Sequence, residues 1–96
     1  MNIVIRIYRG RGVKQLFDIG EQHAAELQAR MRSIPDLVSY TLSRDSEGGF
    51  SVTVCETKRS LNQSIKTARA FLTQHAPKMT VGAMHILEGK VITHVK

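Results

Sequence analysis

Residues 37–56, with the sequence LVSYTLSRDSEGGFSVTVCE, predict a β-hairpin. Apolar and polar residues alternate over 37–44 and again over 50–56, which is the two-residue period of a strand. The residues between them, 45–49, are of the types that favour tight turns. Because so short a turn joins antiparallel strands, this hairpin supplies two neighbouring strands of a sheet.

A strand and a helix are predicted before the hairpin. Residues 3–8 alternate, with isoleucines at 3, 5 and 7. From residue 13 the apolar positions are spaced by three and four, which predicts an amphipathic helix. Pro35 ends this helix, because the residue before a proline avoids the helical region. The apolar stripe consists of Val13, Leu16, Gly20, Ala24, Leu27 and Met31.

After the hairpin, residues 60–63 (SLNQ) match a capping box and predict a second helix, which Pro77 ends. Residues 80–87 predict a fourth strand. Residues 88–90 favour a bulge or turn, and 91–95 alternate like a short fifth strand. Two alternatives stay open for residues 90–95: a hairpin onto the same chain, or an arm that clamps a partner subunit.

This order of elements predicts an α+β fold, a ferredoxin-like β-α-β-β-α-β antiparallel sheet with two helices on one face. Residues 1–96 form one domain of this kind. The most apolar sheet face is expected to pack on the helices, which places Ile5, Leu27, Val52 and Ile65 in the core. The opposite face would then be mixed in polarity and suits a cavity wall or a wet interface. It would carry Val4, Arg6, Tyr8, Ser39, Thr41, Ser51, Thr53 and Cys55.

Composition narrows the class of protein. Fourteen Lys and Arg against eight Asp and Glu give a net charge of +6, but the basic residues are spread along the chain. With so few aromatic residues, nucleic-acid binding is not expected. The single cysteine, Cys55, cannot form an internal disulfide, and no signal peptide or apolar run of about 18 residues is recognised. We therefore expect a cytoplasmic protein without a membrane segment.

Element order, length and the two-faced sheet resemble the dimeric α/β-barrel superfamily, which includes antibiotic-biosynthesis monooxygenase-like domains. Residues 49–56 (GFSVTVCE), followed by a capped helix, and residues 34–40 (IPDLVSY) are similar to small bacterial barrel proteins without an assigned activity. The resemblance covers nearly the whole chain. It implies a homodimer that closes a barrel through the sheet face.

The superfamily includes cofactor-free oxygenases, haem-degrading enzymes, isomerases and ligand-binding regulators, so the resemblance does not decide whether this chain is an enzyme. Haem-degrading members share an Asn, Trp and His set, and this chain has no Trp. We expect a small-molecule cleft and no cofactor, with a cofactor-free monooxygenase-like reaction as first hypothesis. A non-enzymatic metabolite-binding or dimerisation module is the alternative. Residues 9–13 (RGRGV) loosely resemble the phosphate loop of acylphosphatases, a minor alternative.

Five residues are candidates for binding a small anionic or aromatic ligand, and no catalytic residue is assigned: Arg6, Tyr8, Thr53, Cys55 and His85. Arg6 would lie in an interior strand, where a guanidinium needs an anion. That anion could be a ligand or the carboxylate of Glu56. No metal site is expected, because His23 and Glu26 alone provide too few ligands.

Overall fold

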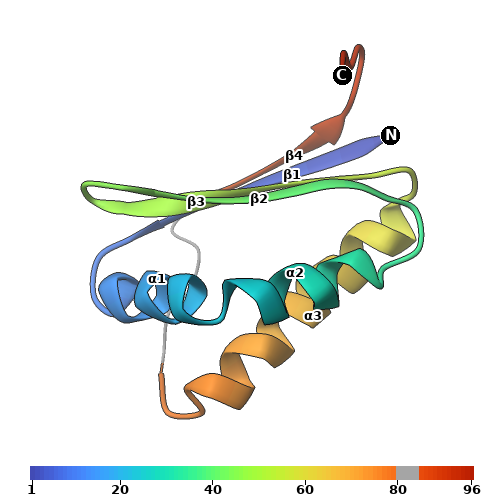
Figure 1. Ribbon diagram of the computed structural model, residues 1–96. Coiled ribbons are helices and arrows are strands. Elements are labelled where there is room, and N and C mark those ends of the chain that lie inside the picture. The colour runs from blue at the N-terminus through green and yellow to red at the C-terminus, as the bar shows by residue number, and fades with distance from the viewer. Residues whose placement is uncertain (80–84) are drawn as a thin grey trace.

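The structure, a computed structural model, describes residues 1–79 and 85–96. Its element order is β1 (Asn2–Arg9), α1 (Val13–Gln22), α2 (Ala24–Arg32), β2 (Leu37–Asp45), β3 (Gly48–Cys55), α3 (Lys58–His75) and β4 (His85–Lys90). The strands form one antiparallel sheet in the order β2-β3-β1-β4. The described helices cover one face of it, and no described element covers the other, the bare face (Figure 1). The α+β, ferredoxin-like architecture is therefore confirmed.

The first predicted helix is two helices, α1 and α2, and the prediction of one helix was wrong. The break lies at His23, whose backbone (φ −116°, ψ 30°) leaves the helical region. An interruption of one residue preserves the spacing of the apolar stripe, so the sequence pattern cannot reveal it. The stripe itself packs as expected, with Leu27 and Met31 buried against Phe71 of α3.

The third helix begins at Lys58, three residues before the start that a Ser60 cap predicts. Its N-cap is Thr57, whose hydroxyl accepts a hydrogen bond from the Ser60 N–H at 3.1 Å. Ser60 is thus a buried residue of the first turn and not the cap. Both residues suit an N-cap, and the earlier one is used.

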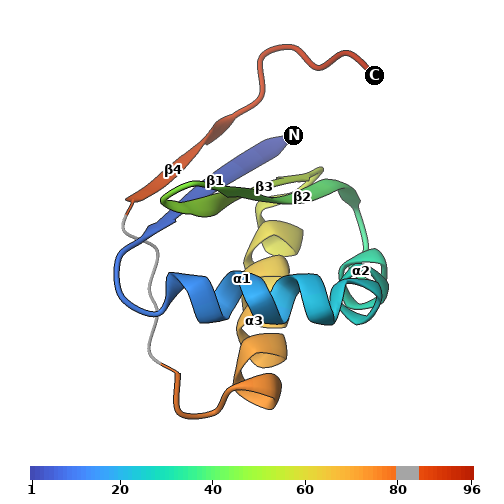
Figure 2. The ribbon, with the colours of Figure 1, turned by 60° about the vertical axis from the view of Figure 1, so that its left-hand side comes forward.

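The C-terminal segment also departs from expectation. Glu88, Gly89 and Lys90 pair with β1 as part of β4, so no turn lies there. The part of the predicted fourth strand at 80–84 lies outside the described residues. No fifth strand forms over 91–96, where Ile92 is 98% and Val95 89% exposed. The tail leaves the sheet on the side away from the helices (Figures 1 and 2), which contradicts the intrachain hairpin.

The two faces of the sheet are exchanged relative to expectation in β1 and β3. Val4 packs with Cys55 on Leu61 of α3, and the Tyr8 ring meets Phe17 of α1 at 6.1 Å between centroids, so these strands turn their mixed face to the helices. In β3, Ser51 and Thr53 are buried while Phe50 and Val52 are only half-buried. Ile5 and Val52 pair on the bare face and are not core residues.

This bare face, the outer face, is the more apolar of the two. Its central pairs are Ile5 with Val52 and Ile7 with Phe50. The pattern correctly detected a strongly apolar sheet face but could not say what covers it.

Candidate functional site

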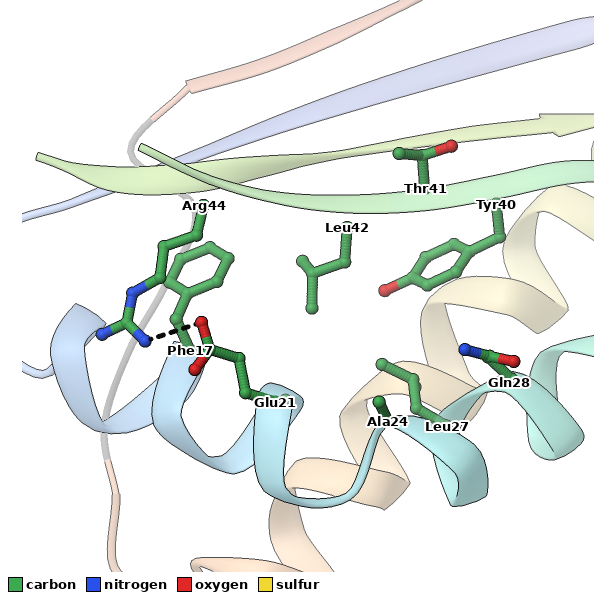
Figure 3. A pocket seen from close by; sticks show the side chains of 10 residues that line it. Phe17, Glu21, Ala24, Leu27, Gln28, Tyr40, Thr41, Leu42 and Arg44 are labelled. Atoms are coloured by element: carbon green, nitrogen blue, oxygen red, sulfur yellow. Dashed lines mark ion pairs between the residues drawn. The ribbon is translucent and has the colours of Figure 1, made fainter. Parts of the chain in front are cut away.

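A cleft of about 430 Å³ opens between β2 and the pair α1–α2 (Figure 3). Its size lies within the range of small-molecule sites. Ten residues line it: Phe17, Gly20, Glu21, Ala24, Leu27, Gln28, Tyr40, Thr41, Leu42 and Arg44. Most of these side chains are apolar, and the charged ones gather near one end (Figure 3).

Ion pairs fasten that charged end. Arg44 of β2 reaches Glu21 at 3.1 Å and Asp18 at 3.0 Å, so it ties the strand to α1. Lys14 also contacts Asp18, at 2.9 Å. Hydrogen bonds from Lys14 and Arg44 lower the pKa of the Asp18 carboxyl below its usual value. Both carboxylates at the charged end of the cleft are therefore already paired, and the salt bridges join β2 to α1 there.

Two smaller spaces lie further inside, between the sheet and α3. One is bounded by Leu27, Phe71 and Leu72 among others, and the other by Arg6, Ser51, Thr53 and Ser64 among others. Tyr40 borders the cleft and both inner spaces, and Tyr8 borders both inner spaces. The Tyr40 side chain is therefore the shared wall between the open cleft and the interior around Arg6.

Arg6 is the unusual residue of this interior. It lies in β1, an interior strand, and its Nε is buried with no hydrogen-bond partner. Among the described residues it forms no ion pair, so the suggested bridge to Glu56 is contradicted. A guanidinium is always charged, and burying it without an acceptor is costly. The Nε of this half-buried guanidinium is therefore left without an acceptor among the described residues.

Hydroxyl groups surround Arg6. Burial raises the pKa of Tyr40 to about 12, with nearby Tyr8 adding to the rise and Arg6 opposing it. The Tyr40 phenol thus keeps its proton and can donate a hydrogen bond. Ser51 and Thr53, each 4% exposed, add hydroxyls from β3. Ser64 adds another, which donates to the Leu61 carbonyl at 2.6 Å. The site combines one cation with several neutral donors.

The structure brings three of the five candidate residues together: Arg6, Tyr8 and Thr53 line the same inner space. Cys55 shares their sheet face but lies further along it, fully buried between Val4 and Leu61. Burial raises the pKa of its thiol, which disfavours the reactive thiolate. His85 is exposed on the edge strand β4 opposite Ile7 of the outer face, away from the site.

Sequence reasoning missed Tyr40 and Ser64 as members of the site, and it placed Ser51 on the cavity-wall face without naming it as a candidate. Tyr40 was expected on the helix-facing side, which is correct, but only as a core residue. Its hydroxyl could have marked it as a site residue, because a buried tyrosine O–H usually needs a hydrogen-bond partner. Ser64 gave no signal, since one small polar residue on a helix is ordinary.

The loop after β1 does not supply a phosphate site of the acylphosphatase type. Arg9 is held by Asp45 at 2.9 Å and Glu47 at 3.5 Å, so its guanidinium is already paired. Gly10 and Gly12 adopt positive φ angles of 89° and 86°, which allow the turn into α1. These residues close one end of the sheet onto the β2–β3 turn.

Comparison with models of protein families and with curated proteins gives no match. Solved structures do match. HapK from Hahella chejuensis is 16% identical with a TM-score of 0.74, covering 100% of this chain and 97% of HapK. The haem degrader MhuD from Mycobacterium tuberculosis is 18% identical with a TM-score of 0.61, covering 99% and 98%. A dimeric ferredoxin-like protein from an uncultured marine organism is 10% identical with a TM-score of 0.62, covering 99% and 94%.

Other matches include proteins of the antibiotic-biosynthesis-monooxygenase type. At these identities the likeness concerns the fold and not the activity. No helix in the described part of the chain is both long and apolar enough to cross a membrane. The strand order, the placement of the helices and these matches agree, and the chain has a ferredoxin-like fold similar to that of these solved structures.

Proposed function

We propose that this protein binds a small, flat, largely apolar organic anion between its helices and its sheet. The observation that carries this proposal is the buried Arg6 Nε, which has no partner among the described residues. A carboxylate, enolate or phenolate oxygen would satisfy the guanidinium by a charge-assisted hydrogen bond. Tyr40 would donate a second hydrogen bond to the same group, because its raised pKa keeps the phenol protonated.

The remaining walls define the rest of the ligand. Leu27, Leu42 and Phe71 bound the space between the open cleft and Arg6. The two inner spaces measure only about 30 and 20 Å³, so a planar ring system would lie in the cleft of about 430 Å³ and reach Arg6 only where side chains move apart. A ligand reaching from the cleft to Arg6 would have to displace the Tyr40 side chain from its position as the shared wall.

A cofactor-free monooxygenase-like reaction is the first hypothesis for chemistry at this site, and the fold shared with proteins of that type supports it. Binding an enol or phenol as its anion makes the ring electron-rich enough to react with O2. One oxygen atom enters the ligand and the other leaves as water, with the electrons supplied by the ligand. Non-enzymatic metabolite binding is the alternative, and oxygen uptake distinguishes the two.

Binding is tested by calorimetry with a panel of aromatic carboxylates and polycyclic phenols. We expect at least one to bind the wild type, and Arg6→Met to weaken that binding by about tenfold or more, the value of one charged hydrogen bond. Arg59→Met, at an exposed position of α3, is the matched control and should bind normally. Equal affinity in wild type and Arg6→Met would refute the proposed role of Arg6.

Two further measurements complete the test. In urea melts Arg6→Met should be at least as stable as the wild type, because it removes a half-buried guanidinium whose Nε has no partner among the described residues. A clear loss of stability would show that Arg6 has a structural role instead. With the ligands that bind, an oxygen electrode should record uptake that Tyr40→Phe reduces. Binding without uptake would support the non-enzymatic alternative.

We also propose that two copies associate through the outer face. Its apolar pairs Ile5–Val52 and Ile7–Phe50 are not covered by any described element (Figures 1 and 2). At the edge, Leu87 of β4 lies opposite Ile5 and is 48% exposed. The dimeric ferredoxin-like neighbour supports this arrangement. It differs from the sequence expectation, which assigned the interface to the face of Arg6 and Cys55.

A further inference from the structure

A second cluster of polar side chains lies outside the lining of the cleft and its inner spaces. His23 occupies the break between α1 and α2, Glu26 lies in the first turn of α2, and His75 is the last residue of α3. From the sequence, His23 and Glu26 provided only two ligands. The fold adds His75, which no local spacing could indicate because it is 49 residues away from Glu26.

The geometry of the three groups suits a metal ion. One ligand atom from each residue lies within 4.8 Å of the others, and all three residues are half-buried. The His75 Nε2 is 2.9 Å from a Glu26 carboxylate oxygen. Zinc bonds of about 2.0–2.2 Å require ligand atoms roughly 3–3.5 Å apart. Closing the site requires the two imidazole rings to turn out of their stack, because each nitrogen lone pair lies in its ring plane and both must point at one ion.

Phe71 and Arg30 contact the side chains of this cluster. The rings of His23 and His75 stack with centroids 3.9 Å apart, and Phe71 contacts both, at 6.4 Å and 4.8 Å. Arg30 pairs with the same Glu26 carboxylate at 3.2 Å. In metal sites such outer contacts orient the ligands, and a carboxylate has a second oxygen free to coordinate while one oxygen stays paired.

We propose that His23, Glu26 and His75 bind a divalent transition-metal ion of the zinc type. Two imidazoles and one carboxylate form a ligand set that zinc accepts, and water completes the coordination. The ion replaces the hydrogen bond between His75 and Glu26. Because the ligands come from the α1–α2 junction and the end of α3, the bound ion joins these helices on the side of the layer that the cleft does not use.

Calorimetric titration of the full chain with zinc chloride tests this site. We expect one zinc per chain, and a loss of affinity of more than about tenfold in Glu26→Gln and in His75→Ala, since even outer-shell changes cost 10–100-fold. His85→Ala and His94→Ala are the matched controls, because both histidines are exposed and outside the cluster. Cys55 does not compete, since it is fully buried.

A second readout separates binding from misfolding. Zinc should raise the melting temperature of the wild type and of both control variants, but not that of Glu26→Gln, whose side chain keeps the shape of glutamate. Cobalt(II) should give visible absorption bands of a low-coordinate site only where the cluster is intact. Absence of zinc binding at millimolar concentration, or equal loss in the control variants, overturns the proposal.

Discussion

Tyr40 is half-buried and lines the same inner space as Arg6 and Tyr8, and its surroundings change how it titrates. Burial raises its pKa in the folded chain to about 12, whereas an unfolded tyrosine ionises near 10. The unfolded chain therefore releases this proton first as the pH rises. The contribution of Tyr40 to stability is complete below about pH 10 and is lost as the pH approaches 12.

We expect the free energy of unfolding to fall more steeply with pH in the wild type than in Tyr40→Phe between about pH 10 and 12. Urea melts at stepped pH measure both slopes. The phenylalanine variant also controls for the lysines that titrate in this range. Parallel slopes would mean that the phenol is hydrated in the folded state.

Gly49 is a position where no side chain fits. A Cβ atom there would collide with the Ser43 carbonyl and with the Phe17 ring, both of which belong to the packed interior. We expect Gly49→Ala to cost about 1–3 kcal/mol of unfolding free energy, as overpacking does.

Gly89 of β4 provides the matched control, because nothing lies within 4 Å of a Cβ built there. Gly89→Ala should stay within about 1 kcal/mol of the wild type. Denaturant melts of both variants give the comparison. If Gly49→Ala is as stable as Gly89→Ala, the Phe17 ring does not lie against Gly49.

At the scale of elements, the sequence predicted which segments are strands and helices better than it predicted which way they face. Two-residue alternation located β1 and β3, but the rule that the greasier face meets the helices failed for both. Ser51 and Thr53 face the helices, and Phe50 and Val52 do not. The rule assumes that only one sheet face is covered, and an apolar outer face violates that assumption. The same error affected the candidate site. The sequence placed Arg6 and Tyr8 on the correct strand, but it assigned their side chains to the face away from the helices, whereas they lie on the helix-facing side.

The C-terminal tail, residues 91–96, carries apolar side chains that its own chain leaves exposed and that a second copy of the chain could cover. It is attached to its own chain by the bond from the Val91 N–H to the Met1 carbonyl at 3.0 Å, and Ile92 and Val95 are almost fully exposed. We propose that it lies on the partner subunit. Deletion of 91–96 keeps β4 intact and should raise the dimer dissociation constant about tenfold or more, or about 1.4 kcal/mol. Analytical ultracentrifugation measures the constant, and an unchanged value would contradict the arm.

For the whole molecule, the outer face predicts the oligomeric state. Size-exclusion chromatography with light scattering at micromolar concentration should give about twice the chain mass of 10.7 kDa. Val52→Glu places a charge at the centre of this face and should shift the mass toward the monomer. Thr73→Glu, exposed on α3, is the control and should remain dimeric. A monomeric wild type would contradict the barrel arrangement.

The cleft and the outer face lie on opposite sides of the sheet, and this decides how many ligands a dimer binds and whether the two clefts influence each other. Arg6 and Tyr40 point to the helices of their own chain, so neither copy lends a side chain to the other's cleft through the sheet contact. Two equivalent clefts would then fill independently, with a Hill coefficient of one. A mixed dimer of one normal chain and one Arg6→Met chain would retain half of the binding capacity at unchanged affinity.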